Sequence, residues 1–256
     1  MFPDFPRYSL DGYPELEGYT WEQCHEGEMG PGTLFQAMDL ARQAGLERGM
    51  RVLDLACGRA LSSVFVARHY GVQVMAGDLN VGPAVNWDRV TRAGLEDLIT
   101  PIKMDARDIP FPEGYFDAVL CVNAYQYFGT DDLYLPYLLK FLKPSGRICI
   151  GGLCFSGEIT AATPREFIVE DEAYAWHSPD WWRDHFTRQS LVDVTHCAAH
   201  PKGREIWLDS TRWRIERRHP KEWDALFRDS ILTEAVALMM DRERFITSFM
   251  LVGRRH

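Results

Sequence analysis

The segment from Arg51 to Ala60 constrains the fold of this chain more than any other. An apolar run that contains Asp54 is followed by small residues around Gly58 and then by a longer apolar stretch. This order predicts a buried strand, a tight turn and a helix. A second apolar run ends on Asp78, and a carboxylate at the tip of a neighbouring strand is suited to binding ribose hydroxyls. The two segments together predict a nucleoside pocket.

Strand and helix patterns alternate along most of the chain. The predicted strands lie at about 51–55, 72–78, 99–104, 116–122, 147–152, 191–197 and 245–252. The predicted helices lie at about 60–70, 83–93 and 135–142, with further helices after Gly30-Pro31-Gly32, after Ser178 and within 203–241, whereas residues 1–29 show no sustained period. Such alternation predicts a parallel sheet with helices on both faces and a ligand at the carboxyl ends of its strands.

The turn after the first strand distinguishes between two kinds of nucleoside. A dinucleotide fingerprint needs glycines at three spaced positions, where this chain has Ala56, Gly58 and Leu61. No Gly-Lys-Ser or Gly-Lys-Thr phosphate loop is present in the sequence. The carboxylate of Asp54 would repel a pyrophosphate but attract the ammonium of a methionine group. These features favour S-adenosyl-L-methionine (SAM) as the cofactor.

The run Leu53-Asp54-Leu55-Ala56-Cys57-Gly58-Arg59-Ala60 resembles the first motif of class I SAM-dependent methyltransferases. The resemblance covers about residues 48–152 and is closest to the small-molecule branch that includes the ubiquinone and menaquinone methyltransferases. It continues in order through Asp78, Met104-Asp105-Ala106, Ile109-Pro110-Phe111-Pro112, Tyr115-Phe116-Asp117-Ala118-Val119 and Leu142-Lys143-Pro144-Ser145-Gly146. One departure is Ala60, which stands where the family usually has glycine.

The resemblance implies a fold as well as a cofactor. We expect an α/β, doubly wound, Rossmann-like sheet of seven strands, in which the last strand is antiparallel, together with a helical lid. The lid segments are expected at about 1–45, 153–177 and 203–241, all within a single methyltransferase domain that spans 1–256.

The same resemblance assigns roles to residues at the strand tips. It implies that Asp54 holds the methionine ammonium and that Ala56 and Gly58 form the close turn. It implies that Asp78 accepts both ribose hydroxyls, with Leu79 beside the adenine. Asp105 and the Ala106 amide would bind the adenine edge. The alternative for each carboxylate is a structural cap or turn residue.

The segment after the fourth strand bears on the acceptor. Enzymes that methylate nucleic-acid amino groups carry Asn or Asp, Pro, Pro and an aromatic residue here, whereas this chain has Asn123-Ala124-Tyr125-Gln126. The missing prolines argue against base methylation. We expect Asn123 to contact the methionine end, and Tyr125 either to face the sulfonium or to belong to the core.

Candidate acceptor residues are fewer. A histidine base would help if the acceptor is a hydroxyl or an acidic carbon, and His177 is the candidate because it lies in a predicted lid loop. His25 and Trp207 lie in the other lid segments and are candidates for acceptor contact, with a packing role as the alternative. The arginines between Lys202 and Lys221 either bind an anionic acceptor or form a solvated helix face.

Composition narrows the possible partners. The chain has 28 Lys and Arg against 37 Asp and Glu, a net charge of −9, which disfavours nucleic acid as a partner. No apolar stretch is long enough to span a membrane, so we expect no membrane insertion and a cytoplasmic location. The six cysteines lack metal-site spacing, so no metal is expected. Buried thiols are the simplest interpretation, ligation of a soft acceptor such as arsenite is the alternative, and a homodimer is left open.

The sequence thus predicts an enzyme that transfers a methyl group from SAM to a small molecule, with the acceptor atom (O, N, S or C) left open. The alternative is a methyltransferase-fold protein that binds SAM or serves as a partner subunit without catalysis, which Ala60 and the absence of a certain catalytic base motivate. A nicotinamide oxidoreductase is a third hypothesis, and Ala56 and Leu61 argue against it.

Overall fold

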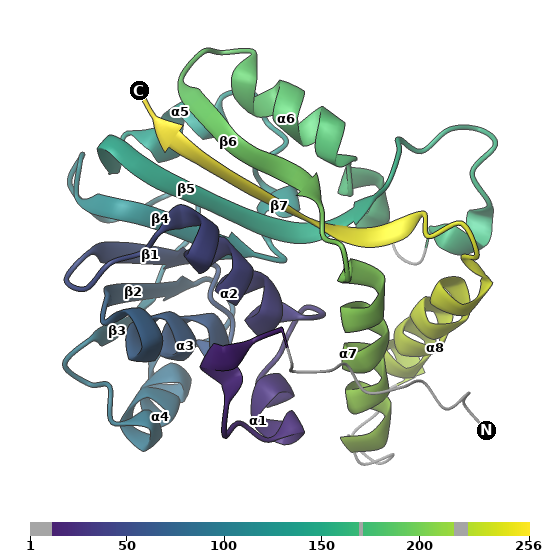
Figure 1. Cartoon of the computed structure of the whole chain (residues 1–256), viewed down its shortest axis with the longest axis horizontal. Helices are drawn as coiled ribbons and strands as arrows, with labels where there is room; N and C mark the ends of the chain where they lie inside the picture. Colours follow the sequence, from purple (N-terminus) through teal and green to yellow (C-terminus); the bar gives the residue numbers. More distant parts are fainter. Residues whose placement is uncertain (1–11, 169–170, 218–224) are drawn as a thin grey trace.

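A computed structural model describes residues 12–168, 171–217 and 225–256 of the chain. Its centre is one seven-stranded sheet with the order β3-β2-β1-β4-β5-β7-β6 (Figure 1). The strands are β1 (Arg51–Leu55), β2 (Gln73–Asp78), β3 (Ile99–Lys103), β4 (Phe116–Val122), β5 (Leu142–Phe155), β6 (Val192–Ala199) and β7 (Ile246–Arg255). The pairs among β1 to β5 are parallel, and β7 pairs antiparallel with both β5 and β6. The predicted fold class is confirmed.

Helices cover both faces of this sheet. They are α1 (Trp21–His25), α2 (Thr33–Ala44), α3 (Leu61–Tyr70), α4 (Pro83–Ala93), α5 (Tyr134–Leu139), α6 (Pro179–Thr187), α7 (Gly203–Arg217) and α8 (Ala225–Met240). Short 3-10 turns are η1 (Pro14–Leu16), η2 (Tyr125–Tyr127), η3 (Arg165–Phe167) and η4 (Asp171–Ala175). Within the described residues, no helix has the length and apolar character needed to cross a membrane.

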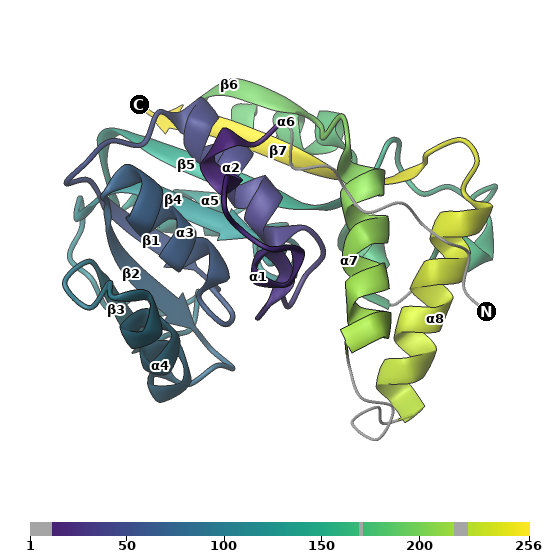
Figure 2. The ribbon, with the colours of Figure 1, turned by 60° about the horizontal axis from the view of Figure 1, so that its bottom comes forward.

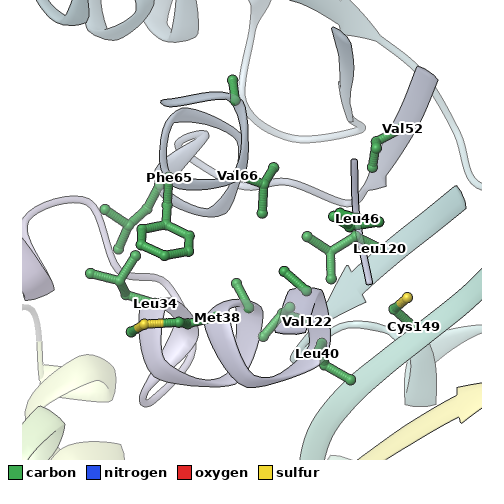
Figure 3. Packing of buried hydrophobic residues seen from close by; sticks show 14 of the residues in the cluster. Leu34, Met38, Leu40, Leu46, Val52, Phe65, Val66, Leu120, Val122 and Cys149 are labelled. Atoms are coloured by element: carbon green, nitrogen blue, oxygen red, sulfur yellow. The ribbon is translucent and has the colours of Figure 1, made fainter. Parts of the chain in front are cut away.

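The alternation of side chains along each strand separates two apolar layers. Val52 and Leu120 face α2 and α3, where they pack with Leu34, Met38 and Phe65 (Figure 3). The intervening strand residues belong to a second cluster with α5 and α6. The central strands are therefore covered on both sides, as expected for a doubly wound sheet.

Helices α7 and α8 lie at the ends of β5 and β7, away from the helices that cover the central strands. Strands β5 and β7 pair as far as Phe155 and Ile246, and a third apolar cluster joins these strand ends to Trp207 and Leu238. Figure 2 shows α7 and α8 side by side on the opposite side of the molecule from β3 and α4. The pair of helices is therefore anchored to the sheet through the extended part of β5 and β7.

Two local predictions needed correction. Strand β5 is longer at both ends than the predicted 147–152, because it pairs with β7 as far as Phe155 and begins at Leu142, before an irregularity opposite Phe116 and Ala118. Residues 1–29 contain the helix α1, which begins with a capping box. The Thr20 hydroxyl accepts from the Gln23 amide at 3.2 Å, and the Gln23 side chain accepts from the Thr20 amide at 2.8 Å.

Candidate functional site

A cavity of about 550 Å³ opens at the carboxyl ends of neighbouring parallel strands. Residues that end or follow β1, β2, β3 and β4 line one part of it, and residues of the N-terminal segment, α7 and α8 line the rest. Every residue predicted to bind the cofactor lies in this lining, namely Asp54, Ala56, Gly58, Asp78, Leu79, Asp105, Ala106 and Asn123. Parallel strands bring their carboxyl ends to one edge of a sheet, which explains why residues so far apart in sequence meet.

Asp54 is a buried carboxylate at the end of β1. One of its oxygens accepts hydrogen bonds from the hydroxyls of Ser62 at 2.7 Å and Ser63 at 2.5 Å, in the first turn of α3. Burial raises the pKa of Asp54 to about 6, against the hydrogen bonds from Ser63 and Ser62, and the nearby charge of Asp78 raises it further. A cation in the cavity would stabilise the ionised form of this carboxylate.

The turn after β1 holds three residues in the left-handed region, where Ala56, Gly58 and Ala60 have φ of 58°, 55° and 57°. A Cβ at Gly58 would lie 2.9 Å from the sulfur of Met29, and the left-handed φ of Gly58 favours glycine whatever the space around it. The left-handed φ of Ala60 gives a physical reason for the glycine that the family in the resemblance usually has at this place. Its methyl group is buried, and Ala60 is not among the residues that line the cavity, so it does not crowd the site.

Asp78 connects the turns that follow β1 and β2. Its Oδ2 accepts from the Gly58 amide at 2.8 Å, and its Oδ1 accepts from the amides of Asn80 and Val81, both at 2.7 Å. A carboxylate offers about four lone-pair sites. These bonds leave room for one further donor on Oδ2, rather than for a donor on each oxygen.

Asp105 and Ala106 lie in a turn after β3. Oδ1 of Asp105 accepts from the Arg107 amide at 2.8 Å, as in an Asx turn, and the Ala106 carbonyl accepts from the Tyr134 hydroxyl at 3.0 Å. Helix α5, which carries Tyr134, thus fixes this side of the cavity. Leu79 is 48% exposed at the rim.

Asn123 connects the N-terminal segment to the edge of the sheet through hydrogen bonds. Its Nδ2 donates to the Pro31 carbonyl at 3.0 Å and to the Thr33 hydroxyl at 3.3 Å, and its Oδ1 accepts from Gln36 at 3.0 Å. A Cβ at Gly30 would lie 2.5 Å from the Cβ of Asn123. Asn123 therefore contributes to the cavity by positioning residues 30–33.

Three predicted residues, Tyr125, His177 and His25, lie outside the cavity lining. Tyr125 is 1% exposed and packs against Trp182 and Phe186 in the core, so the core alternative describes its position. The His177 ring stacks on Trp181 with 3.7 Å between centroids, and its Nδ1 lies 2.9 Å from Glu158. The structure therefore gives no geometric support for a catalytic role of Tyr125 or His177.

His25 belongs to a buried network behind the cavity wall. Its Nδ1 lies 2.7 Å from Glu28 and its Nε2 lies 3.0 Å from Asp209, which also accepts from the Trp21 indole. Burial alone would lower the pKa of His25, but the hydrogen bonds to Asp209 and Glu28 outweigh it and raise this pKa to about 9. With both nitrogens engaged and its ring outside the cavity lining, His25 connects the N-terminal segment to α7.

The wall formed by α7 and α8 contains Glu234, which was not among the site residues predicted from the sequence. Trp207 lines the cavity as a candidate acceptor residue, and Arg214 and Glu234 line it beside Trp207. Arg214 and Glu234 form an ion pair of 2.6 Å, so this arginine is not part of a solvated face. A signal for Glu234 existed, because it is the charged residue within the apolar run 231–240.

The cysteines agree with the simplest interpretation, since all six are free and buried. Burial raises the pKa of Cys57, Cys121 and Cys154 well above the usual value. Their thiols are therefore in the protonated form that packs as a small apolar group. The described residues contain no group of three or more His, Cys, Asp or Glu side chains arranged to hold a metal ion.

Part of this chain is similar to known methyltransferases. Residues 52–146 match a family described as a methyltransferase domain. A fatty-acid O-methyltransferase from Mycolicibacterium smegmatis is 36% identical over 41% of this chain and 38% of its own length. A ubiquinone/menaquinone biosynthesis C-methyltransferase from Idiomarina loihiensis is 30% identical over 46% of this chain and 47% of its own length. The chain thus spans less than half the length of these relatives.

A solved structure extends the likeness across the fold. The structure of phosphoethanolamine N-methyltransferase 2 from Haemonchus contortus, in complex with SAM, matches this chain with a TM-score of 0.72 and 18% identity. The match includes 96% of this chain and 58% of the other. This similarity concerns the fold. The resemblance predicted from the motif series is confirmed over residues 52–146.

Proposed function

We propose that this chain, which carries a methyltransferase domain over residues 52–146, transfers a methyl group from SAM to a small-molecule acceptor. The observation that carries the proposal is the convergence of Asp54, Gly58, Asp78 and Asp105 in one cavity, from segments that end or follow three neighbouring strands. Three acidic residues, Asp54, Asp78 and Asp105, line this part of the cavity against two basic ones, Arg59 and Arg107, and no glycine-rich phosphate loop accompanies them. The site therefore suits a nucleoside that carries a positive charge rather than a phosphate.

The donor set fits SAM group by group. Asp54 is buried and would hold the methionine ammonium, because a cation compensates the burial of its charge. Asp78 would accept a ribose hydroxyl through the remaining capacity of Oδ2. Asp105 and the Ala106 amide would bind the adenine edge, with Leu79 beside the ring. When bound, SAM supplies an activated methyl group, and the protein supplies position and a dry environment.

The remaining residues of the cavity lining are assigned to contact with the acceptor. Of the predicted lid segments, residues 27–33, Leu153, α7 and α8 contribute to the cavity wall. Residues 34–44 belong to α2, which packs on the sheet as Figure 3 shows for Leu34, Met38 and Leu40. We therefore propose a smaller lid that consists of residues 27–33 and the α7–α8 pair. A cytoplasmic location, a homodimer and the role of His177 stay predictions.

Calorimetry with SAM and S-adenosylhomocysteine (SAH) tests this proposal. We expect both to bind the wild-type protein, and Asp78→Ala to weaken SAH binding by about 1–3 kcal/mol because hydrogen-bonded donors lose their partner. Asp88→Ala, at an exposed position on α4, is the matched control and should bind SAH as the wild type does. Absence of SAH binding at millimolar concentration would refute the proposal.

Turnover separates catalysis from the non-catalytic alternative. SAH release in the presence of a host metabolite extract would exclude a protein that only binds SAM or serves as a partner subunit. That alternative rested on Ala60, which is not among the residues that line the cavity, and on the absence of a certain catalytic base, which turnover would answer. An extract that supports SAM binding but no SAH release would favour it.

A further inference from the structure

Glu234 presents one oxygen of a buried carboxylate to the cavity. The residue is 7% exposed and belongs to the lining. Its Oε1 accepts from the Trp207 indole and from the Arg214 guanidinium at 2.6 Å, and it lies 3.4 Å from the Thr211 hydroxyl, which donates to the Trp207 carbonyl at 2.9 Å. Its Oε2 accepts no hydrogen bond from the residues that the structure describes. The two oxygens of one carboxylate therefore have very different surroundings.

This asymmetry calls for a hydrogen-bond donor in the cavity. Among the described residues, Oε2 is not one of the buried oxygens that lack a partner, so it is accessible from the cavity and can accept from a ligand. The two donors on Oε1, Trp207 and Arg214, also fix the orientation of the carboxylate, so that Oε2 is held in place before a ligand arrives. Such a fixed, partly desolvated oxygen is suited to bind an O–H or N–H group of a ligand.

The charge of the same wall disfavours an anionic ligand. Arg214 already donates to Glu234 and to the Thr211 hydroxyl at 3.1 Å, so its charge is compensated within the protein. A ligand carboxylate would lie next to the carboxylate of Glu234, and two such charges repel each other. Trp207 and Leu153 add apolar surface to this wall. The complementary ligand is therefore apolar and carries a protonated donor group.

On the basis of the proposed methyl transfer, we propose that Glu234 binds the acceptor through Oε2 and that the acceptor is an apolar alcohol or amine rather than a carboxylate. The oxygen or nitrogen of the acceptor forms the bond to the methyl carbon while the sulfur–methyl bond breaks and its electron pair stays on sulfur. The acceptor proton passes to Oε2 of Glu234 and then to solvent. The products are the methylated acceptor, SAH and one proton.

The position of Glu234 in the molecule agrees with this role. The residues assigned to SAM end or follow β1, β2 and β3, whereas Glu234 belongs to α8, which lies on the opposite side of the molecule from β3 and α4 (Figure 2). An acceptor between them would keep its oxygen or nitrogen bound to Glu234 and turn a lone pair of that atom toward the strand edge. A base within hydrogen-bond reach of the acceptor contributes about 10²–10⁴-fold to proton transfer reactions.

The test uses three probes that share one chain and differ in the head group: 1-octanol, octylamine and octanoate. Each is titrated into the protein saturated with SAH, and each is also incubated with SAM while SAH release is followed. The variants are Glu234→Gln, which removes the charge, and Glu234→Asp, which keeps the charge but shortens the side chain. Glu216→Gln is the matched control, since Glu216 is an exposed residue of the same helical pair that bonds Arg212 at 2.7 Å.

We expect 1-octanol or octylamine to bind the SAH complex at least tenfold more tightly than octanoate. Glu234→Gln should remove this preference and lower SAH release at least tenfold, Glu234→Asp should retain part of both, and Glu216→Gln should change neither. Tighter binding of octanoate, equal binding of the three probes, no binding of any, or a preference that survives in Glu234→Gln would overturn the inference. Failure of the wild-type protein to bind SAH would instead refute the proposed function, and the inference with it.

Discussion

Replacement of His25 tests whether the buried network around this histidine stabilises the folded protein. His25 is 0% exposed and its two nitrogens contact Glu28 and Asp209. The pKa of this histidine is raised from 6.5 to about 9, so its protonated form is favoured in the folded protein. Each tenfold change in a protonation equilibrium is worth about 1.4 kcal/mol, which makes the stabilisation about 3 kcal/mol.

The sign of the pH dependence follows from the raised pKa. The stabilisation is fully present below pH 6.5, where the unfolded chain is also protonated, and it is lost as the pH rises through 9. In His25→Gln the imidazolium is absent at every pH, so this part of the pH dependence should disappear. The variant should also be less stable at pH 6, by about 3–5 kcal/mol, since Glu28 and Asp209 lose their counter-charge.

Urea denaturation at several values between pH 6 and pH 9.5 measures this directly. The free energy of unfolding of the wild type should fall by about 3 kcal/mol more than that of His25→Gln over this range. His256→Gln, at the exposed carboxyl terminus, is the control and should follow the wild type. Parallel pH profiles for the wild type and His25→Gln would refute an imidazolium in this network.

Two further predictions concern residues of the cavity and the core. Burial raises the pKa of Asp54 from 3.8 to about 6, so ionisation of this group lowers the stability of the empty protein as the pH rises through this interval. Asp54→Asn should therefore raise the free energy of unfolding at pH 7 by up to about 3 kcal/mol. The same substitution should weaken SAH binding at least tenfold. A variant less stable than the wild type would contradict this reasoning. The Tyr125 hydroxyl is buried without a hydrogen-bond partner among the described residues. Tyr125→Phe should leave the urea midpoint unchanged or higher and SAH affinity unaltered, because no hydrogen bond is lost, whereas weaker SAH binding would place Tyr125 at the cofactor after all.

The position of the predicted cofactor residues in one cavity could be anticipated because each depends on a short stretch of chain. The apolar run before Asp54 and the small residues after it encode a buried strand and a tight turn, and the same holds for Asp78. Parallel strands then bring these tips together by topology alone. The antiparallel last strand followed from the family resemblance and is confirmed in β7.

Other residues could not be placed this way. Asn123 was expected at the methionine end, but its side chain holds residues 31–36, whose approach to β4 depends on how α2 packs on the sheet. Tyr125 is only two positions further on and lies in the core, since the 3-10 turn after β4 directs its ring toward α6. Neither position has a periodic pattern that would reveal its partners.

The sequence by itself determined the sheet, the tips of its strands and the kind of cofactor they suit, because local periodicity, turn residues and charge act over a few neighbouring positions. Only the tertiary structure decided the far wall of the cavity. The contacts of His25 with Asp209 and of Trp207 with Glu234 join segments that are 184 and 27 residues apart. Such contacts arise from the packing of α1 on α2 and α7, and of α7 on α8 and β7, and no local pattern encodes them.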